Sequence, residues 1–292
     1  MPELPEVEVV KQSLEKYILN KFLIKIIVKN KKLRFPIPKY LSSKLSNLKI
    51  VKVKRISKYV VIEFKVKIYL IIHLGMSGTL HLIKKSNRVK NTNLSFYHYK
   101  NLPKKHNHVF FNFKNFTIIY NDPRRFGFIK LLKDQKSLIN YFSKLGPDPF
   151  EKNFNFNYIK KYLYNKKKNI KNTLVDKKFI SGVGNIYASE ILNYSKINPL
   201  KLSGNISDNE IYKIIFFTKK ILKRSIKKGG TSIMNFSSIK GNRGLYQNEF
   251  RVYDREDKKC KNKLCLGTII KINISKRSTY LCNICQNNQK FN

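Results

Sequence analysis

The sequence predicts an α+β protein, and three observations carry that prediction. From Ile24 to about Lys130, apolar and polar residues alternate in short runs, as they do in half-buried strands. After Pro149 the apolar residues recur at helical spacing. All four cysteines fall within the last 33 residues. We therefore expect an antiparallel β-sandwich, then a helical domain, then a small metal-binding hairpin.

The N-terminal half begins with a helix. Apolar residues at three- and four-residue spacing follow Pro5 and extend to Ile18, so an amphipathic helix is expected there, with Pro2 and Glu3 just ahead of it. The strands that follow are expected at 51–54, 59–64 and 68–72, with a hairpin of 109–113 and 116–120 around Lys114 and Asn115.

The C-terminal half is separated by a cluster of residues that break regular structure, Gly146 to Pro149. Beyond it, Ser207 and Glu210 have the spacing of a capping box, and Gly229-Gly230 marks the end of the helix they begin. Ile211, Ile214, Ile215 and Leu222 form the apolar stripe of that helix. The predicted divisions are a sandwich at 1–133, a linker at 134–150, a helical domain at 151–250 and a cysteine-containing module at 251–292.

The composition points to a polyanionic partner. Sixty-one lysines and arginines against 17 acidic residues give a formal charge of +44, and a cationic surface gains affinity by releasing counterions from phosphates. The abundance of lysine, asparagine and isoleucine suggests a biased genome, so the charge does not locate the site. With no signal peptide and no membrane-spanning run, we expect a soluble cytoplasmic protein associated with the nucleoid and no membrane partner.

The cysteines have the spacing of a metal site. Cys260 and Cys265 form one pair and Cys282 and Cys285 another, with 16 residues between the pairs. Two such knuckles suit one structural zinc ion held by four thiolates, and cytoplasmic thiols stay reduced. The alternative, four incidental core cysteines, is weak because the chain has no others.

The opening residues have a chemistry of their own. If Met1 is removed, Pro2 presents a secondary α-amine, which titrates near pH ~8 and can condense with an aldehyde-like sugar carbon. Glu3 beside it can move the protons that this step requires. The alternative is that the two residues only stiffen an ordinary N-terminus.

Several motifs, in order along nearly the whole chain, resemble those of bacterial formamidopyrimidine-DNA glycosylases. They are Pro2–Glu8, Arg55–Tyr59, His73–Gly78, Asp122–Gly127, Leu145–Pro149, Gly182–Glu190, Gly229–Thr231 and the four-cysteine module. The resemblance implies a sandwich joined to a helix–two-turns–helix domain and a zinc finger. It also implies a monomeric base-excision-repair enzyme acting on damaged double-stranded DNA. Such an enzyme removes oxidised purines (8-oxoguanine and formamidopyrimidines) through a proline Schiff base, then cuts the strand by β- and δ-elimination as an AP lyase.

The resemblance also implies roles for individual residues. Pro2 and Glu3 would begin the reaction, with Lys58 and Arg277 as proton donors in the first and second elimination. Met76, Arg124 and Phe126 would fill the gap left by an everted nucleotide, and His106, Lys166 and Asn185 would contact the DNA backbone. The chain departs from the family's usual pattern at Ile56 and Ser57, and in the four residues between Cys260 and Cys265, where two are commoner.

Two other functions remain open from the sequence. One is the related endonuclease that removes oxidised pyrimidines by the same amine chemistry. The other is a non-catalytic basic zinc-ribbon protein that binds nucleic acid, which accounts for the charge and cysteines but leaves Pro2 and Glu3 unexplained.

Overall fold

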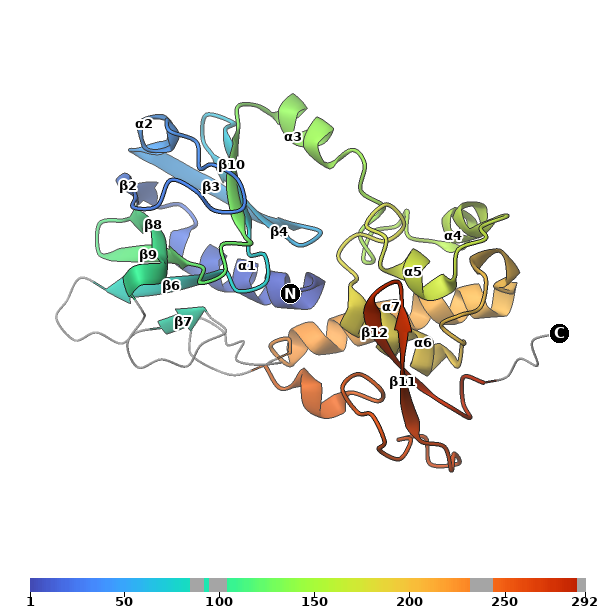
Figure 1. The fold of residues 1–292 in the computed structure, drawn as a ribbon. Coiled ribbons are helices and arrows are strands. Elements are labelled where there is room, and N and C mark those ends of the chain that lie inside the picture. Colours follow the sequence, from blue (N-terminus) through green and yellow to red (C-terminus); the bar gives the residue numbers. More distant parts are fainter. Residues whose placement is uncertain (85–91, 95–103, 232–243, 288–292) are drawn as a thin grey trace. The chain divides into compact units, whose positions relative to one another are not determined.

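The computed structural model describes residues 1–84, 92–94, 104–231 and 244–287 (Figure 1). The chain forms two compact units. The first comprises Met1–Ser143 and Ile226–Gln247, and the second comprises Lys144–Ser225 and Asn248–Asn292. The two units are described separately below.

The first unit is a sandwich of two antiparallel sheets with helix α1 (Leu4–Ile18). One sheet has the order β1-β3-β4-β5-β10 and the other β2-β8-β9-β6-β7. The strands are β1 (Phe22–Leu23), β2 (Lys25–Val28), β3 (Leu48–Ile56), β4 (Tyr59–Phe64), β5 (Tyr69–His73), β6 (Thr79–Lys84), β7 (Thr92–Leu94), β8 (Asn107–Asn112), β9 (Phe116–Asn121) and β10 (Phe128–Leu132). Short helices are α2 (Leu41–Leu45), η1 (Lys104–His106) and α3 (Gln135–Phe142). The predicted sandwich and its N-terminal helix are confirmed.

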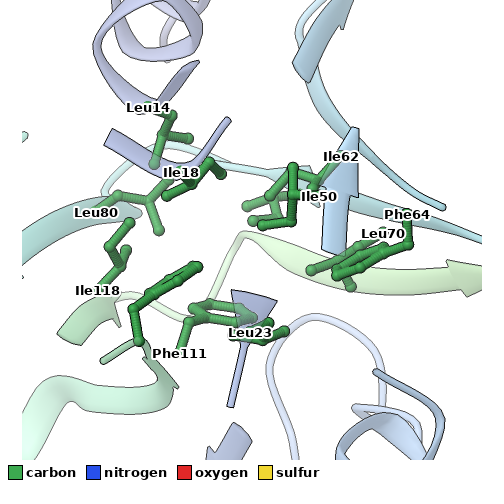
Figure 2. A pocket seen from close by; sticks show the side chains of 12 residues that line it. Leu14, Ile18, Leu23, Ile50, Ile62, Phe64, Leu70, Leu80, Phe111 and Ile118 are labelled. Atoms are coloured by element: carbon green, nitrogen blue, oxygen red, sulfur yellow. The ribbon is translucent and has the colours of Figure 1, made fainter. Parts of the chain in front are cut away.

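The core of this unit lies where α1 and both sheets bring their apolar side chains together (Figure 2). Leu14 and Ile18 come from α1, while Phe64 and Phe111 come from strands of different sheets. A void of about 20 Å³ remains among them, and its lining is entirely apolar. The void has room for a single water molecule at most, and its apolar lining offers that water no hydrogen-bond partner. It is therefore a packing defect and not a ligand site. This core holds α1, and with it the N-terminus of the chain.

Helix α3 lies inside the segment that the sequence analysis assigned to a linker. Asp134 caps the helix by accepting the backbone N–H of Ser137 at 2.7 Å. Leu138 packs against Val61 and Ile71 in a second apolar cluster of the first unit. The helix has only eight residues, too few for a clear periodic pattern, so it was missed. The domain boundaries given above stay a prediction.

The second unit is helical and ends in a hairpin. Its helices are α4 (Phe156–Leu163), α5 (Ile170–Leu174), α6 (Asn185–Ser195), η2 (Ser203–Asn205) and most of α7 (Asp208–Lys227), followed after the chain returns from the first unit by part of η3 (Tyr246–Glu249). The hairpin pairs β11 (Ile269–Ile274) with β12 (Arg277–Cys282).

The start and the end of α7 agree with the sequence analysis. Ser207 donates its backbone N–H to Glu210 at 2.8 Å, and Glu210 donates its own to the Ser207 hydroxyl at 3.3 Å, which completes the capping box. Gly229 and Gly230 follow the helix with φ of 78° and 79°, a conformation that glycine adopts without strain. In the described part of the chain, no helix has an apolar stretch long enough to cross a membrane.

Candidate functional site

The residues that follow Met1 are buried and held by hydrogen bonds at the start of α1. Glu3 caps α1, accepting the backbone N–H of Glu6, while its own N–H donates to the Glu6 carboxylate at 2.9 Å. Pro5 stands in the first turn, where no N–H is needed. Pro2 is buried and Glu3 is 4% exposed. The capping box therefore fixes the backbone of both candidate catalytic residues.

Glu6 joins this end of α1 to the Gly229–Thr231 motif. Its second carboxylate oxygen accepts both the backbone N–H and the hydroxyl of Thr231, each at 3.0 Å. A Cβ on Gly230 would lie 3.2 Å from the same oxygen, so the glycine permits the close approach. The sequence analysis quoted both motifs but did not assign Glu6. Its position three residues after Glu3 was the available signal.

Charged side chains surround the amino end. Burial lowers the pKa of the Met1 amine; Glu3 and Glu6 oppose this effect, whereas Lys58 and Arg124 add to it. Lys58, Glu3 and Arg124 therefore lie near enough to one amine to act on its charge.

Lys58 lies in the two-residue turn between β3 and β4. The turn begins at Ser57 with a φ of 55°. Arg55 supports it, because its guanidinium donates to the Ser57 carbonyl at 3.2 Å and to Glu8 of α1 at 2.8 Å. The departure from the family pattern at Ser57 therefore lies in the turn itself, and Arg55 connects the turn that carries Lys58 to α1.

Two neighbouring turns carry the three predicted void-filling residues. Met76 projects from the turn between β5 and β6 and is 41% exposed; Phe126 projects from the turn before β10 and is 43% exposed. The Arg124 guanidinium lies over the Phe126 ring, 4.7 Å from its centroid. Exposed large apolar side chains are common on this chain, so what marks these two is that they lie on adjacent turns beside Arg124.

His106 lies beside the second of these turns. Its carbonyl accepts the backbone N–H of Asp122 at 3.1 Å. Burial lowers the pKa of its imidazole, and the nearby charges of Lys105, His108 and Arg125 lower it further. A lowered pKa favours the neutral imidazole, whose ring N–H can donate to a phosphate.

In the second unit, Asn185 is the first residue of α6, after Gly184. Its side-chain oxygen accepts from the Lys171 ammonium at 2.5 Å, and its amide donates to the Ser278 carbonyl at 2.9 Å, next to Arg277. Asn185 is thus bonded to the strand that begins with Arg277. Lys171 is completely buried. No signal in the sequence pointed to it, because one lysine in so basic a chain does not stand out.

Lys166 lies apart from these two residues. It is exposed in the turn after α4, its ammonium 5.3 Å from the centroid of the Tyr162 ring. Its carbonyl accepts the backbone N–H of Gly204 at 3.0 Å. Its contact with DNA stays a prediction that rests on the resemblance alone.

The four cysteines converge at the base of the hairpin. Their sulfur atoms all lie within 4.8 Å of one another. Backbone N–H groups of Asn262, Gly267 and Cys285 point at three of the sulfurs, at 3.3–3.4 Å. Burial raises the pKa of the Cys260 thiol to about 12, whereas the Gly267 N–H lowers that of Cys265 to about 7. The long first knuckle therefore does not prevent convergence, and the four sulfur atoms lie close enough together to hold one metal ion.

Comparisons with known proteins agree with this arrangement. Residues 1–129 match the formamidopyrimidine-DNA glycosylase N-terminal domain, and residues 145–237 match the H2TH domain of the same enzymes. A formamidopyrimidine-DNA glycosylase of Wolbachia pipientis is 39% identical over 288 residues, 98% of this chain and all of the relative.

Solved structures give the same result. A mutant of the Lactococcus lactis enzyme in complex with Fapy-dG-containing DNA is 31% identical, covers 98% of this chain and 99% of its own, and has a TM-score of 0.86. The Lactococcus lactis enzyme with abasic-site DNA is also 31% identical, covers 97% and 99% respectively, and has a TM-score of 0.85.

The fold and the comparisons define a base-excision-repair DNA glycosylase with AP lyase activity. The chain belongs to the formamidopyrimidine-DNA glycosylase family. The predicted fold class, family and activity are confirmed, and a non-catalytic zinc ribbon is ruled out. The roles of individual residues stay predictions.

Proposed function

We propose that this chain excises oxidised purines from double-stranded DNA with the α-amine of Pro2 as nucleophile, after removal of Met1. The observation that carries the proposal is that Pro2 and Glu3 are buried and held by the capping box, close to Lys58 and Arg124. The same burial that lowers the pKa of the Met1 amine would act on the Pro2 amine and keep more of it unprotonated.

The proposed reaction has two stages. The Pro2 nitrogen attacks the anomeric carbon, the glycosidic bond breaks, and the base leaves with a proton. Glu3 moves protons as the sugar ring opens and an iminium forms. The iminium acidifies neighbouring sugar protons, so their loss expels first the 3′ phosphate and then the 5′ phosphate. Lys58 and Arg277 would donate protons in the first and second elimination.

The remaining residues would bind and deform the DNA. Asn185 at the start of α6, His106 and Lys166 suit phosphate contacts. Met76, Arg124 and Phe126 suit the gap that an everted nucleotide leaves. The relatives solved with lesion-containing DNA support such a partner. We infer that the enzyme works as a monomer in the cytoplasm, at the nucleoid where chromosomal DNA lies.

Zinc is the metal that the cysteine cluster fits. Four thiolates in a tetrahedron around zinc, at ~2.3 Å each, lie ~3.8 Å apart. The sulfur atoms of Cys260 and Cys285 are 3.9 Å apart, and those of Cys265 and Cys282 are 3.6 Å apart. A zinc ion would have a structural role there, holding the hairpin that carries Arg277.

An incision assay on duplexes with a single 8-oxoguanine tests the proposal. Glu3→Gln should slow base release by roughly 10²–10⁴-fold, because a positioned proton-transfer group is lost. Glu15→Gln is the matched control, since it removes a carboxylate near the other end of α1 and should leave the rate unchanged. Full activity of Glu3→Gln, or faster release of oxidised pyrimidines than of 8-oxoguanine by the unmodified protein, would contradict the proposal.

A further inference from the structure

Asp122 lies at the centre of a buried hydrogen-bond network next to the two turns that carry Met76, Arg124 and Phe126. These three residues are called the wedge below. It is 0% exposed. One carboxylate oxygen accepts the Ser77 hydroxyl at 2.5 Å; the other accepts the Gly127 backbone N–H at 2.8 Å and the Tyr120 hydroxyl at 3.3 Å. Burying a carboxylate is costly unless it is well bonded, and this one is bonded to both turns at once.

Ser77 extends the network to Arg124. Its hydroxyl donates to Asp122 and accepts the backbone N–H of Arg124 at 3.2 Å. Ser77 directly follows Met76 in the chain. One hydroxyl therefore connects the turn that carries Met76 with the turn that carries Arg124 and Phe126.

The two turns are also packed backbone against backbone. A Cβ on Gly75, whose φ is 62°, would lie 2.4 Å from the Gly127 nitrogen and from the Phe126 carbonyl carbon. No side chain fits at that position. The turns form one continuous surface, and the bonds of Asp122 and Ser77 fix their register.

We propose that Asp122 and Ser77 are positioning residues that lock the two turns into a single preformed wedge. Unstacking a base step costs a few kcal/mol, and the inserted side chains must hold the base pairs apart against that cost. They can do so only if the backbone of their turns keeps its position. The proposal rests on the void-filling role given to Met76, Arg124 and Phe126 under the proposed function.

The test compares two substrates that demand different amounts of base eversion. Removing 8-oxoguanine from a duplex requires a stacked base to be flipped, whereas borohydride trapping on abasic DNA requires no base to be unstacked. Ser77→Ala should lower kcat on the 8-oxoguanine duplex roughly tenfold, about the factor for one buried hydrogen bond, while trapping on abasic DNA stays within about twofold.

Thr79→Val is the matched control. Thr79 is fully buried near Ser77, and its hydroxyl bonds to His81 and to the Asn121 carbonyl instead of the wedge turns. It should destabilise the sandwich without changing the ratio of the two activities. If Ser77→Ala folds poorly, Asp122→Asn is the second variant. Its amide oxygen can face the Gly127 N–H, but its amide nitrogen cannot accept the Ser77 hydroxyl proton as the carboxylate does, so it should show the same selective loss.

Met76→Ala separates the possible failures. If Met76→Ala loses 8-oxoguanine activity selectively but Ser77→Ala and Asp122→Asn change both activities equally, the positioning role is wrong and the proposed wedge stands. If Met76→Ala shows no selective loss, the wedge assignment fails and this inference fails with it.

Discussion

Asn185 is more constrained than a simple phosphate contact requires. Its oxygen is occupied by the buried ammonium of Lys171, so the amide must face the Ser278 carbonyl. What it offers a phosphate is the second amide hydrogen, beside the N–H groups at the start of α6. Lys171 thus orients Asn185 without itself reaching the surface.

Arg277 gives the first residue-scale prediction. Arg277→Ala should leave base removal largely intact and stall the products after β-elimination, with the unsaturated sugar still on the 3′ end. Loss of a positioned acid should slow the second elimination by roughly 10²–10⁴-fold. Gel separation of the two 3′ ends measures this at saturating enzyme. Lys276→Ala, on the same turn and equally cationic, is the control; unchanged δ-elimination in the Arg277 variant would show that it is only a solvated cation.

Glu190 gives a prediction about pH. It is fully buried and accepts the N–H groups of Arg251, Val252 and Tyr253, each at 2.9 Å. Burial raises its pKa above the ordinary value of 4.5 despite these bonds. A raised folded-state pKa means that the folded state holds the proton more tightly than the unfolded state does, so this stability is present at low pH and lost as pH rises through the folded value.

The measurement is urea unfolding of the wild type and Glu190→Gln between pH 5 and pH 8. As pH rises, the free energy of unfolding of the wild type should fall relative to that of Glu190→Gln, because only the wild type loses the proton on residue 190. A difference that is flat, or that shifts the other way, would mean that the three N–H bonds outweigh the burial.

At the scale of elements, the C-terminal hairpin acts as an arm. Cys282 ends β12 and Arg277 begins it, so the cysteine cluster and the arginine are ~17 Å apart at ~3.3 Å per residue. The tip turns at Ser275 and Lys276, both with positive φ. Asn172 bonds to Ser275 at 2.8 Å and Asn185 to Ser278, so the tip has supports besides the cluster at its base.

Removing the metal tests this arm. We expect one zinc per chain, and its removal by a chelator should abolish DNA binding while the N-terminal sandwich stays folded. The finger buries too little core to fold alone, so metal-binding energy serves as its folding energy. Metal analysis measures the zinc content, circular dichroism measures whether the sandwich stays folded, and a DNA-binding assay measures the loss of binding. Purified protein that contains no zinc and whose four thiols all titrate freely would contradict the proposed zinc site.

Periodic elements could be predicted from the sequence, and short or irregular ones could not. The helix after Pro5 and the strand at 59–64 have patterns long enough to read, and α1 and β4 are found there. Helix α3 is short and held by a tertiary contact of Leu138, which no local pattern shows. The capping box Ser207–Glu210 was predictable because it is a purely local signal.

At the scale of the whole molecule, the residues given roles by the resemblance are divided between the two units. The first contains the amino end and the wedge, and the second contains Asn185, Arg277 and the cysteines. The order of motifs was enough to identify the family. The contacts that support them were not visible in the sequence, because they join distant residues: Glu6 and Thr231 are 225 positions apart, and Ser77 and Asp122 are 45 apart.

The central claim is that the N-terminal amine of Pro2 is the nucleophile, and borohydride trapping on abasic DNA tests it most directly. Mass spectrometry of the trapped complex should place the DNA on Pro2 in a protein that has lost Met1. A form with a permanent N-terminal extension should give no cross-link, because its amine is blocked, although its fold is unchanged. A cross-link on an internal lysine of the unmodified protein, or equal trapping by the extended form, would contradict the claim.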